Sequence, residues 1–128
     1  MRSIQTVILA LLAATTVVNA AQYCGGEALA APVDAAQDCV NYLREKGDQS
    51  CEFNGKSIEF CYSHVGGGKT SIVGANWASG FTKTTCNDVA DAAQVVIDDC
   101  QKDGKTRGEQ PAPQHREMRV LVQYDPEG

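Results

Sequence analysis

The sequence predicts an α+β fold, in which two helices cover one face of a mostly antiparallel sheet of four to five strands in a two-layer α/β sandwich. Two segments carry apolar residues at helical spacing, and a group of extended segments separates them. A further alternating segment follows the second helical one. Strands grouped apart from a few helices are typical of the α+β class.

The two helices are predicted from the 3.6-residue period of their apolar positions. Residues 33–46 place Ala36, Val40 and Leu43 at i, i+4 and i+7, and Gly47 follows where a helix should end. The second helix, over residues 86–103, has one apolar face, which consists of Val89, Ala93, Val96, Ile97 and Cys100. Thr84 or Thr85 can cap its amino-terminal end. We expect this helix to pack on Val120 and Val122.

The expected order is a short amino-terminal extended piece, a helix, three strands, a helix and a last strand. The strands are the segment that leads into Asn54-Gly55 and residues 57–65, 70–77 and 116–124. Asn54-Gly55 favours a two-residue hairpin turn leading into 57–65, and three glycines at 66–68 separate that strand from 70–77. The last strand alternates, with Met118, Val120, Val122 and Tyr124 on one face.

The first twenty residues have the pattern of a secretion signal. Arg2 precedes an apolar stretch, and Val18-Asn19-Ala20 has the small-residue spacing that a signal peptidase accepts. Residues 21–128 then form one secreted domain and, we expect, a monomer. Removing Arg2 leaves 10 basic side chains against 16 acidic ones, so the formal charge changes from -5 to -6. No later segment is apolar enough to span a membrane.

The six cysteines all lie after residue 20, and an exported domain of this size is expected to join them in three disulfides. Cys86 and Cys100 cannot bond to each other, because opposite ends of one helix lie roughly 21 Å apart. The predicted hairpin also disfavours a bond between Cys51 and Cys61, whose thiols would lie on opposite faces. The other pairings stay open.

Composition disfavours several partners. An acidic domain is a poor ligand for nucleic acid, which is held mainly by Lys and Arg. Two histidines 51 positions apart and six oxidised cysteines predict no metal site, and Gly66-Gly67-Gly68-Lys69-Thr70 lacks the first glycine of a phosphate-binding loop. We expect no cofactor.

Residues 101–115 are the longest irregular stretch and the one locally basic segment. They contain Lys102, Lys105 and Arg107, and Arg116 follows directly. A recognition loop and a solvated connection explain this segment equally well. We expect this segment to be the leading contact surface. If it is only a connection, the turn at 66–69 and the surface around Trp77 and Phe81 are the next candidates.

His64 and His115 offer an enzymatic alternative. Two histidines could act as acid and base in a small secreted ribonuclease, and Glu117 and Arg119 lie near His115 in the sequence. The interpretation we favour is that both histidines are ordinary surface residues.

Several cysteine-containing segments resemble those of small proteins secreted by filamentous fungi. These segments are Tyr23-Cys24-Gly25, Gln37-Asp38-Cys39-Val40, Phe60-Cys61-Tyr62 and Ile72-Val73-Gly74. The second half is similar to the carboxy-terminal helix and strand of the necrosis-inducing secreted effectors and killer-toxin-like proteins, through CNDVADAAQ at 86–94, Cys100, Gly104 and the strand from 118 to 122. The resemblance covers nearly all of residues 21–128.

The resemblance implies a disulfide-stapled α/β sandwich of split β-α-β units that acts on a host or a competitor and has no known catalytic residues. It also implies a Cys39–Cys61 bond. The relatives join their first cysteine to one in the last strand, which here has none, so we expect Cys24 to bond Cys86, on the argument that the end of the last strand lies near the start of the second helix. Cys51 and Cys100 would then form the third pair.

The expected function is therefore that of a non-enzymatic fungal effector or toxin-like protein, with virulence or antagonism as its context. It would bind a host or competitor protein or another cell-surface target. An inhibitor of host extracellular hydrolases and a ribonuclease using His64 and His115 are the alternatives.

Overall fold

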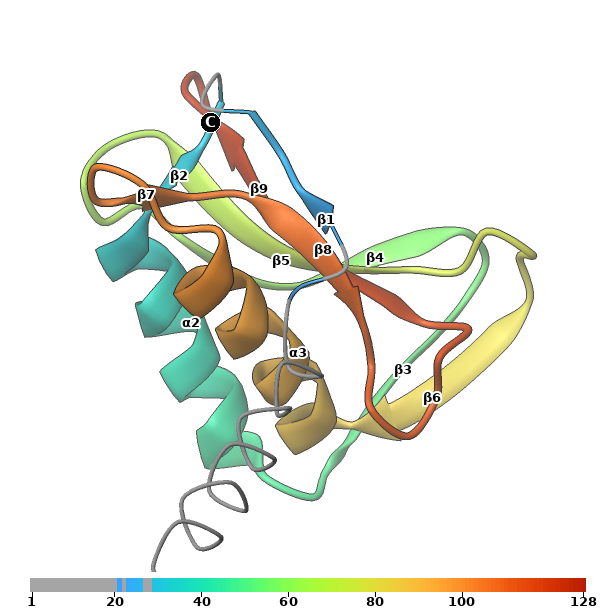
Figure 1. The fold of residues 1–128 in the computed structure, drawn as a ribbon. Helices are drawn as coiled ribbons and strands as arrows, with labels where there is room; N and C mark the ends of the chain where they lie inside the picture. The colour runs from blue at the N-terminus through green and yellow to red at the C-terminus, as the bar shows by residue number, and fades with distance from the viewer. Residues whose placement is uncertain (1–20, 22, 27–28) are drawn as a thin grey trace, which may run out of the picture.

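A computed structural model describes residues 21, 23–26 and 29–128, so the expected signal at 1–20 lies outside the described residues. The predicted α+β class is confirmed, with two helices, mostly antiparallel strands and three disulfides in the described part (Figure 1). The first helix, α2, spans Val33–Lys46, as predicted. The second, α3, spans Cys86–Asp99 and is shorter than predicted.

Nine strands are assigned in the described residues. They are β1 (Tyr23–Cys24), β2 (Ala31–Pro32), β3 (Ser50–Asn54), β4 (Ser57–Ser63), β5 (Lys69–Ala75), β6 (Phe81–Thr85), β7 (Lys105–Thr106), β8 (Gly108–Pro111) and β9 (Arg119–Asp125). Five form a sheet in the order β1-β8-β9-β5-β4, while β2 pairs with β7 and β3 with β6. The registered pairs are all antiparallel.

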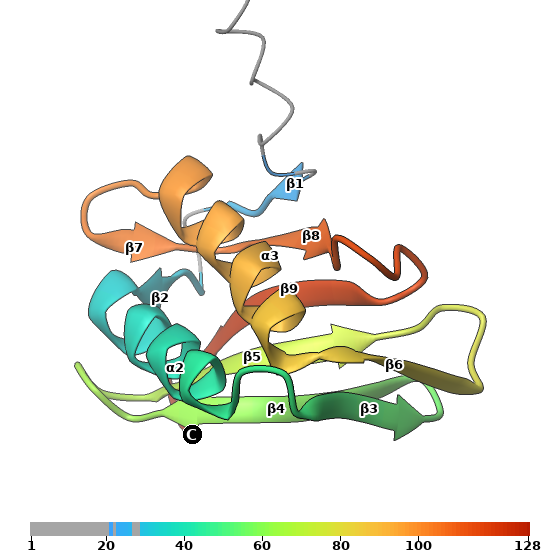
Figure 2. The ribbon, with the colours of Figure 1, turned by 90° about the horizontal axis from the view of Figure 1, so that it is seen from below.

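The core lies between the helices and the five-stranded sheet. The two helices contact each other, and α2 also contacts β4 and β5 while α3 contacts β8 and β9. Figure 2 shows both helices on the same side of the sheet. Four members of the predicted face of α3 are buried together with Val120 and Val122, namely Val89, Ala93, Val96 and Ile97. The fifth, Cys100, is half-buried and lies just after the end of the helix.

The ends of α3 follow from local backbone chemistry. At its start, the Thr85 hydroxyl accepts a hydrogen bond from the backbone N–H of Asp88 at 3.1 Å, as a helix cap should. The helix ends before Cys100, and a turn at Asp103 and Gly104, both with positive φ, brings Lys105 back to Lys102. The predicted extension to residue 103 is therefore wrong.

The predicted hairpin at Asn54-Gly55 is also wrong. The strand β3 pairs with β6 and places Asn54 opposite Phe81, whereas β4 pairs with β5 and places Ser57 opposite Ala75. The chain therefore bends between β3 and β4 and again between β5 and β6, where one strand pair gives way to the other. The backbone N–H of Gly55 in the first bend donates a hydrogen bond to the carbonyl of Gly80 in the second. Figure 1 shows the β3–β6 pair diverging from the main sheet at these bends.

Residues 101–115 are not the irregular loop that the sequence indicates. They include β7 and β8, and β8 lies inside the five-stranded sheet between β1 and β9. Short strands interrupted by glycine and proline have little alternating pattern, so periodicity could not reveal them.

The disulfides are Cys24–Cys100, Cys39–Cys61 and Cys51–Cys86. The Cys39–Cys61 bond is the one that the resemblance implies. The expected Cys24–Cys86 and Cys51–Cys100 bonds are wrong.

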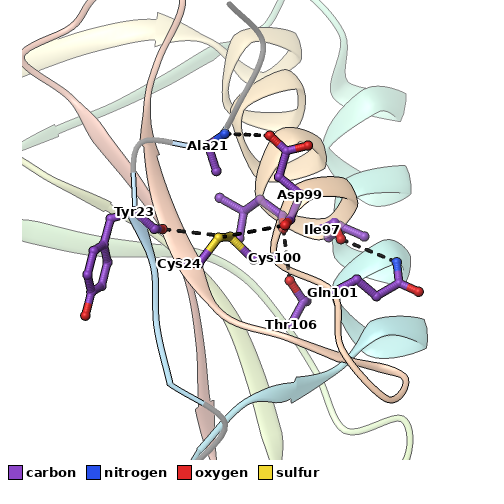
Figure 3. Close-up of a disulfide and its surroundings, with 9 residues drawn as sticks. Ala21, Tyr23, Cys24, Ile97, Asp99, Cys100, Gln101 and Thr106 are labelled. Carbon is purple, nitrogen blue, oxygen red and sulfur yellow. Dashed lines mark hydrogen bonds between the residues drawn. A yellow bond between two sulfur atoms is a disulfide. The ribbon is translucent and has the colours of Figure 1, made fainter. Parts of the chain in front are cut away.

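The strand pairings explain both corrections. Because β1 pairs with β8, Cys24 lies opposite Gly108 and beside the end of α3, where Cys100 is located (Figure 3). Because β3 pairs with β6, Cys51 lies opposite Thr84, just before the start of α3 at Cys86. Cys24–Cys100 therefore links β1 to the end of α3, and Cys51–Cys86 links β3 to its start.

Candidate functional site

The structure separates the predicted contact residues into three places. Lys102, Lys105 and Arg107 line one depression, Arg116 lines another, and Trp77 lies on the loop between β5 and β6. Arg116 therefore lines a different depression from the other three basic residues.

The first depression has a volume of about 450 Å³ and lies against the Cys24–Cys100 disulfide. Asp99 and Asp103 also line it, so its charge is mixed. Arg107 supports the amino-terminal segment, because its carbonyl accepts a hydrogen bond from the Gly25 N–H at 2.9 Å. A Cβ atom at position 25 would lie 2.8 Å from the Arg107 side chain. Arg107 is thus a half-buried packing residue.

Arg116 lines a depression of about 500 Å³ on the acidic flank of α3. Three carboxylates line this depression, those of Asp91, Asp98 and Asp99. Arg44 also lines it and forms an ion pair with Asp91 at 2.8 Å. The lining thus carries both signs of charge, and an exposed ion pair such as Arg44–Asp91 contributes little stability.

Trp77 and Phe81 form what we call the aromatic corner. Their side chains are 67% and 61% exposed, the two largest values among the exposed large hydrophobic residues of the described chain. Both lie where the chain passes from β5 to β6, at the end of the molecule away from α2 (Figure 1). The sequence placed Trp77 on a strand face, but β5 ends at Ala75.

A structured turn holds Trp77 at this corner. Asn76 is only 5% exposed, and its side-chain oxygen accepts a hydrogen bond from the Ala78 N–H at 3.1 Å. Its backbone N–H donates to Lys56 and its carbonyl accepts from Ser79. Ser79 has φ of 67°, a conformation that costs a non-glycine residue about 1 kcal/mol or more. The turn therefore presents an exposed indole on a fixed backbone.

The two histidines lie at opposite ends of the sheet. His64 follows β4 near the start of β5, which pairs with the end of β9, whereas His115 precedes the start of β9. A seven-residue strand spans about 20 Å at about 3.3 Å per residue, so one phosphodiester could not contact both rings.

Each histidine has local partners. The Nδ1 atom of His64 lies 2.8 Å from the Gly68 carbonyl, and that of His115 lies 3.5 Å from Glu117. Arg119 pairs with Glu109 on β8 rather than with His115 or Glu117.

A further exposed region, which the sequence did not indicate, lies around Glu59 on β4. Its carboxylate pairs with Lys69 at 3.0 Å and accepts a hydrogen bond from Ser71. Partial burial acts to raise the pKa of Glu59, but the Ser71 hydroxyl and the Lys69 ammonium outweigh it and hold the pKa below its usual value.

Within residues 21, 23–26 and 29–128, no three His, Cys, Asp or Glu side chains gather closely enough to hold a metal ion. In the same residues, no helix is both long enough and apolar enough to cross a membrane.

These features define a small, disulfide-stapled α+β domain with an exposed aromatic corner. The chain belongs to the family described as "Domain of unknown function (DUF8794)", whose model matches residues 17–124. Neither the curated proteins nor the solved structures gave a match to this chain.

Proposed function

We propose that this chain is a secreted, non-enzymatic fungal effector or killer-toxin-like protein that binds a host or competitor target through the aromatic corner. We further infer a monomeric two-layer sandwich of the split β-α-β type as its scaffold. Three disulfides support an extracellular location, since such bonds persist mainly in oxidising compartments.

The exposure of Trp77 on a hydrogen-bonded turn is the observation that carries the proposal. Aromatic side chains, Trp above all, supply much of the energy at protein interfaces when a partner removes them from water. Covering an indole that is 67% exposed would stabilise a complex, and the fixed turn lowers the entropy lost on binding. Function on loops held by a rigid scaffold is the general pattern.

Activity measurements on candidate hosts and competing fungi test this function. Purified wild type is applied beside the double variant Trp77→Ala, Phe81→Ala, with cell death and growth inhibition as readouts. Tyr23→Ala is the matched control, because Tyr23 is 60% exposed but lies on β1. We expect the corner variant to fold and to lose at least tenfold in activity, while the control keeps it.

RNA cleavage is measured with the same preparations and with His64→Ala and His115→Ala. Cleavage that either histidine variant abolishes would replace the binding function by the ribonuclease alternative. A folded corner variant with full activity would also overturn the proposal.

A further inference from the structure

The strand β4 leaves one backbone edge unpaired by any described strand. It is the last strand in the order β1-β8-β9-β5-β4, so β5 is its one sheet neighbour in the described part of the chain. In an antiparallel pair, alternate residues direct their N–H and C=O groups away from the partner strand. Such an edge can pair with an additional extended chain.

A groove of about 470 Å³ runs along this edge, and we call it the edge groove. Its residues are Asp38, Asn41, Tyr42 and Glu45 from α2, and Glu59, Phe60, Cys61 and Tyr62 from β4. The α2 residues recur at i, i+3, i+4 and i+7, which places them on one stripe of the helix. The Cys39–Cys61 disulfide joins the two walls and fixes the distance between them.

The edge groove is acidic. Asp38, Glu45 and Glu59 line it, and its lining residues include no lysine, arginine or histidine. Lys69 offsets the charge of Glu59, so most of the negative charge in the groove comes from Asp38 and Glu45 on α2. An acidic lining favours partners with positively charged side chains. Such charge complementarity improves the specificity of binding more than its affinity.

The groove's tyrosines already contact alkylammonium groups. The Lys46 ammonium lies 5.2 Å from the centroid of the Tyr42 ring, and the Lys69 ammonium lies 5.2 Å from that of Tyr62. The two tyrosines are 47% and 57% exposed. Aromatic faces beside carboxylates favour lysine and arginine side chains.

We propose that the edge groove binds an extended, basic peptide segment of a partner protein as an added strand on β4. Backbone hydrogen bonds to β4 would supply affinity, and alternate Lys or Arg side chains would meet Asp38 and Glu45. This second surface goes beyond the aromatic corner and gives the chemistry of a partner that the corner does not specify.

Fluorescence anisotropy with labelled heptapeptides of alternating lysine and valine tests the proposal. A second peptide, in which glutamate replaces each lysine, tests the requirement for positive charge and should bind more weakly than the lysine peptide. Two further probes carry N-methyl groups on the odd or on the even backbone nitrogens. Because only one edge of an added strand can bond to β4, one methylated probe should bind at least tenfold more weakly and the other should bind within about threefold of the parent.

The protein variants test the location. Asp38→Lys, Glu45→Lys should weaken binding of the lysine peptide at least tenfold. The control Glu52→Lys, Asp98→Lys carries the same charge change on exposed residues of β3 and α3 and should change the affinity less than about twofold. Bound peptide should slow amide hydrogen exchange at residues 59–62.

Three results would each overturn the proposal. They are no binding of the lysine peptide at millimolar concentration, equal effects of the two methylation patterns, and equal weakening by the groove and control variants. None of them bears on the aromatic corner, whose activity assay fails or succeeds independently.

Discussion

Gly74 lies directly against the ring of Phe60 at the bend between the two strand pairs. A Cβ atom at position 74 would lie 2.5 Å from Cε2 of Phe60 and 3.2 Å from Cε1 of Phe53. The two rings meet edge to face with centroids 6.1 Å apart, which is a favourable aromatic geometry. The absence of a side chain at Gly74 therefore allows this aromatic pair to fill the inside of the bend.

Gly74→Ala should destabilise the fold. The added methyl group must displace the Phe60 ring, and overpacking of this kind costs about 1–3 kcal/mol. Gly26→Ala is the control, because a Cβ atom there meets nothing within 4 Å. Urea unfolding should give a lower midpoint for Gly74→Ala alone, and equal midpoints for the two variants would refute the packing argument.

Mild reduction should open the Cys24–Cys100 bond first. Cys24 is exposed and Cys100 half-buried, whereas each of the other two bonds contains at least one cysteine that is at most 5% exposed; Cys61, the partner of Cys39, is half-buried. A reductant therefore reaches the first bond without prior opening of the core. Alkylation and peptide mapping after limited reduction should find labels at 24 and 100 while circular dichroism is largely unchanged. Earlier labelling of Cys51 and Cys86 would contradict this order.

Glu59 should contribute to acid sensitivity. Its folded-state pKa lies below the ordinary value of 4.5, so its stabilisation is present above that value and is lost as pH falls through the folded pKa. Glu59→Gln removes this contribution. The stability gap between wild type and Glu59→Gln should therefore be wide near about pH 6 and narrow near about pH 3. A gap that does not change over this range would show that Ser71 and Lys69 do not stabilise the carboxylate.

Removal of the expected signal should stabilise the folded domain through a contact between Ala21 and Asp99. The Ala21 nitrogen lies 2.6 Å from Oδ2 of Asp99, close to the end of α3, which has no basic residue in its last turn (Figure 3). A chain beginning at Ala21 would place a charged amine there. Compared with a chain carrying Gly-Ser before Ala21, it should be more stable by about 0.3–1 kcal/mol in thermal unfolding. The difference should shrink in Asp99→Asn, and its persistence would exclude the pair as the cause.

Sequence periodicity predicted the long elements well because their buried faces are regular. The bounds of α2 were predicted in full, and the buried face of the last strand was predicted through Val120 and Val122 of β9 and Met118 just before it. Period alone carries no information about which strands pair. Asn54-Gly55 therefore predicted a local hairpin, although pairing of β3 with the distant β6 determines the actual bend.

The candidate site was less predictable for the same reason. The strand β8 is four residues long and contains glycine and proline, so the segment around it was interpreted as a basic loop. Missing β8 also misplaced Cys24, since the partner of β1 decides where that cysteine lies. Trp77 was chosen from its residue type, but its exposure depends on the turn that Asn76 holds.

The fluorescence of Trp77 tests the binding function most directly. It is the only tryptophan in the chain, so all indole emission reports on the aromatic corner. Purified protein is titrated with cell-wall and plasma-membrane fractions of a host or fungus that responds in the activity assay, and sedimentation measures the bound fraction independently. We predict that the emission shifts to shorter wavelength and that the indole becomes protected from a soluble quencher as binding rises. Sedimentation of the protein with the responsive target, with unchanged Trp77 emission and unchanged quenching, would contradict the claim that this corner makes the contact.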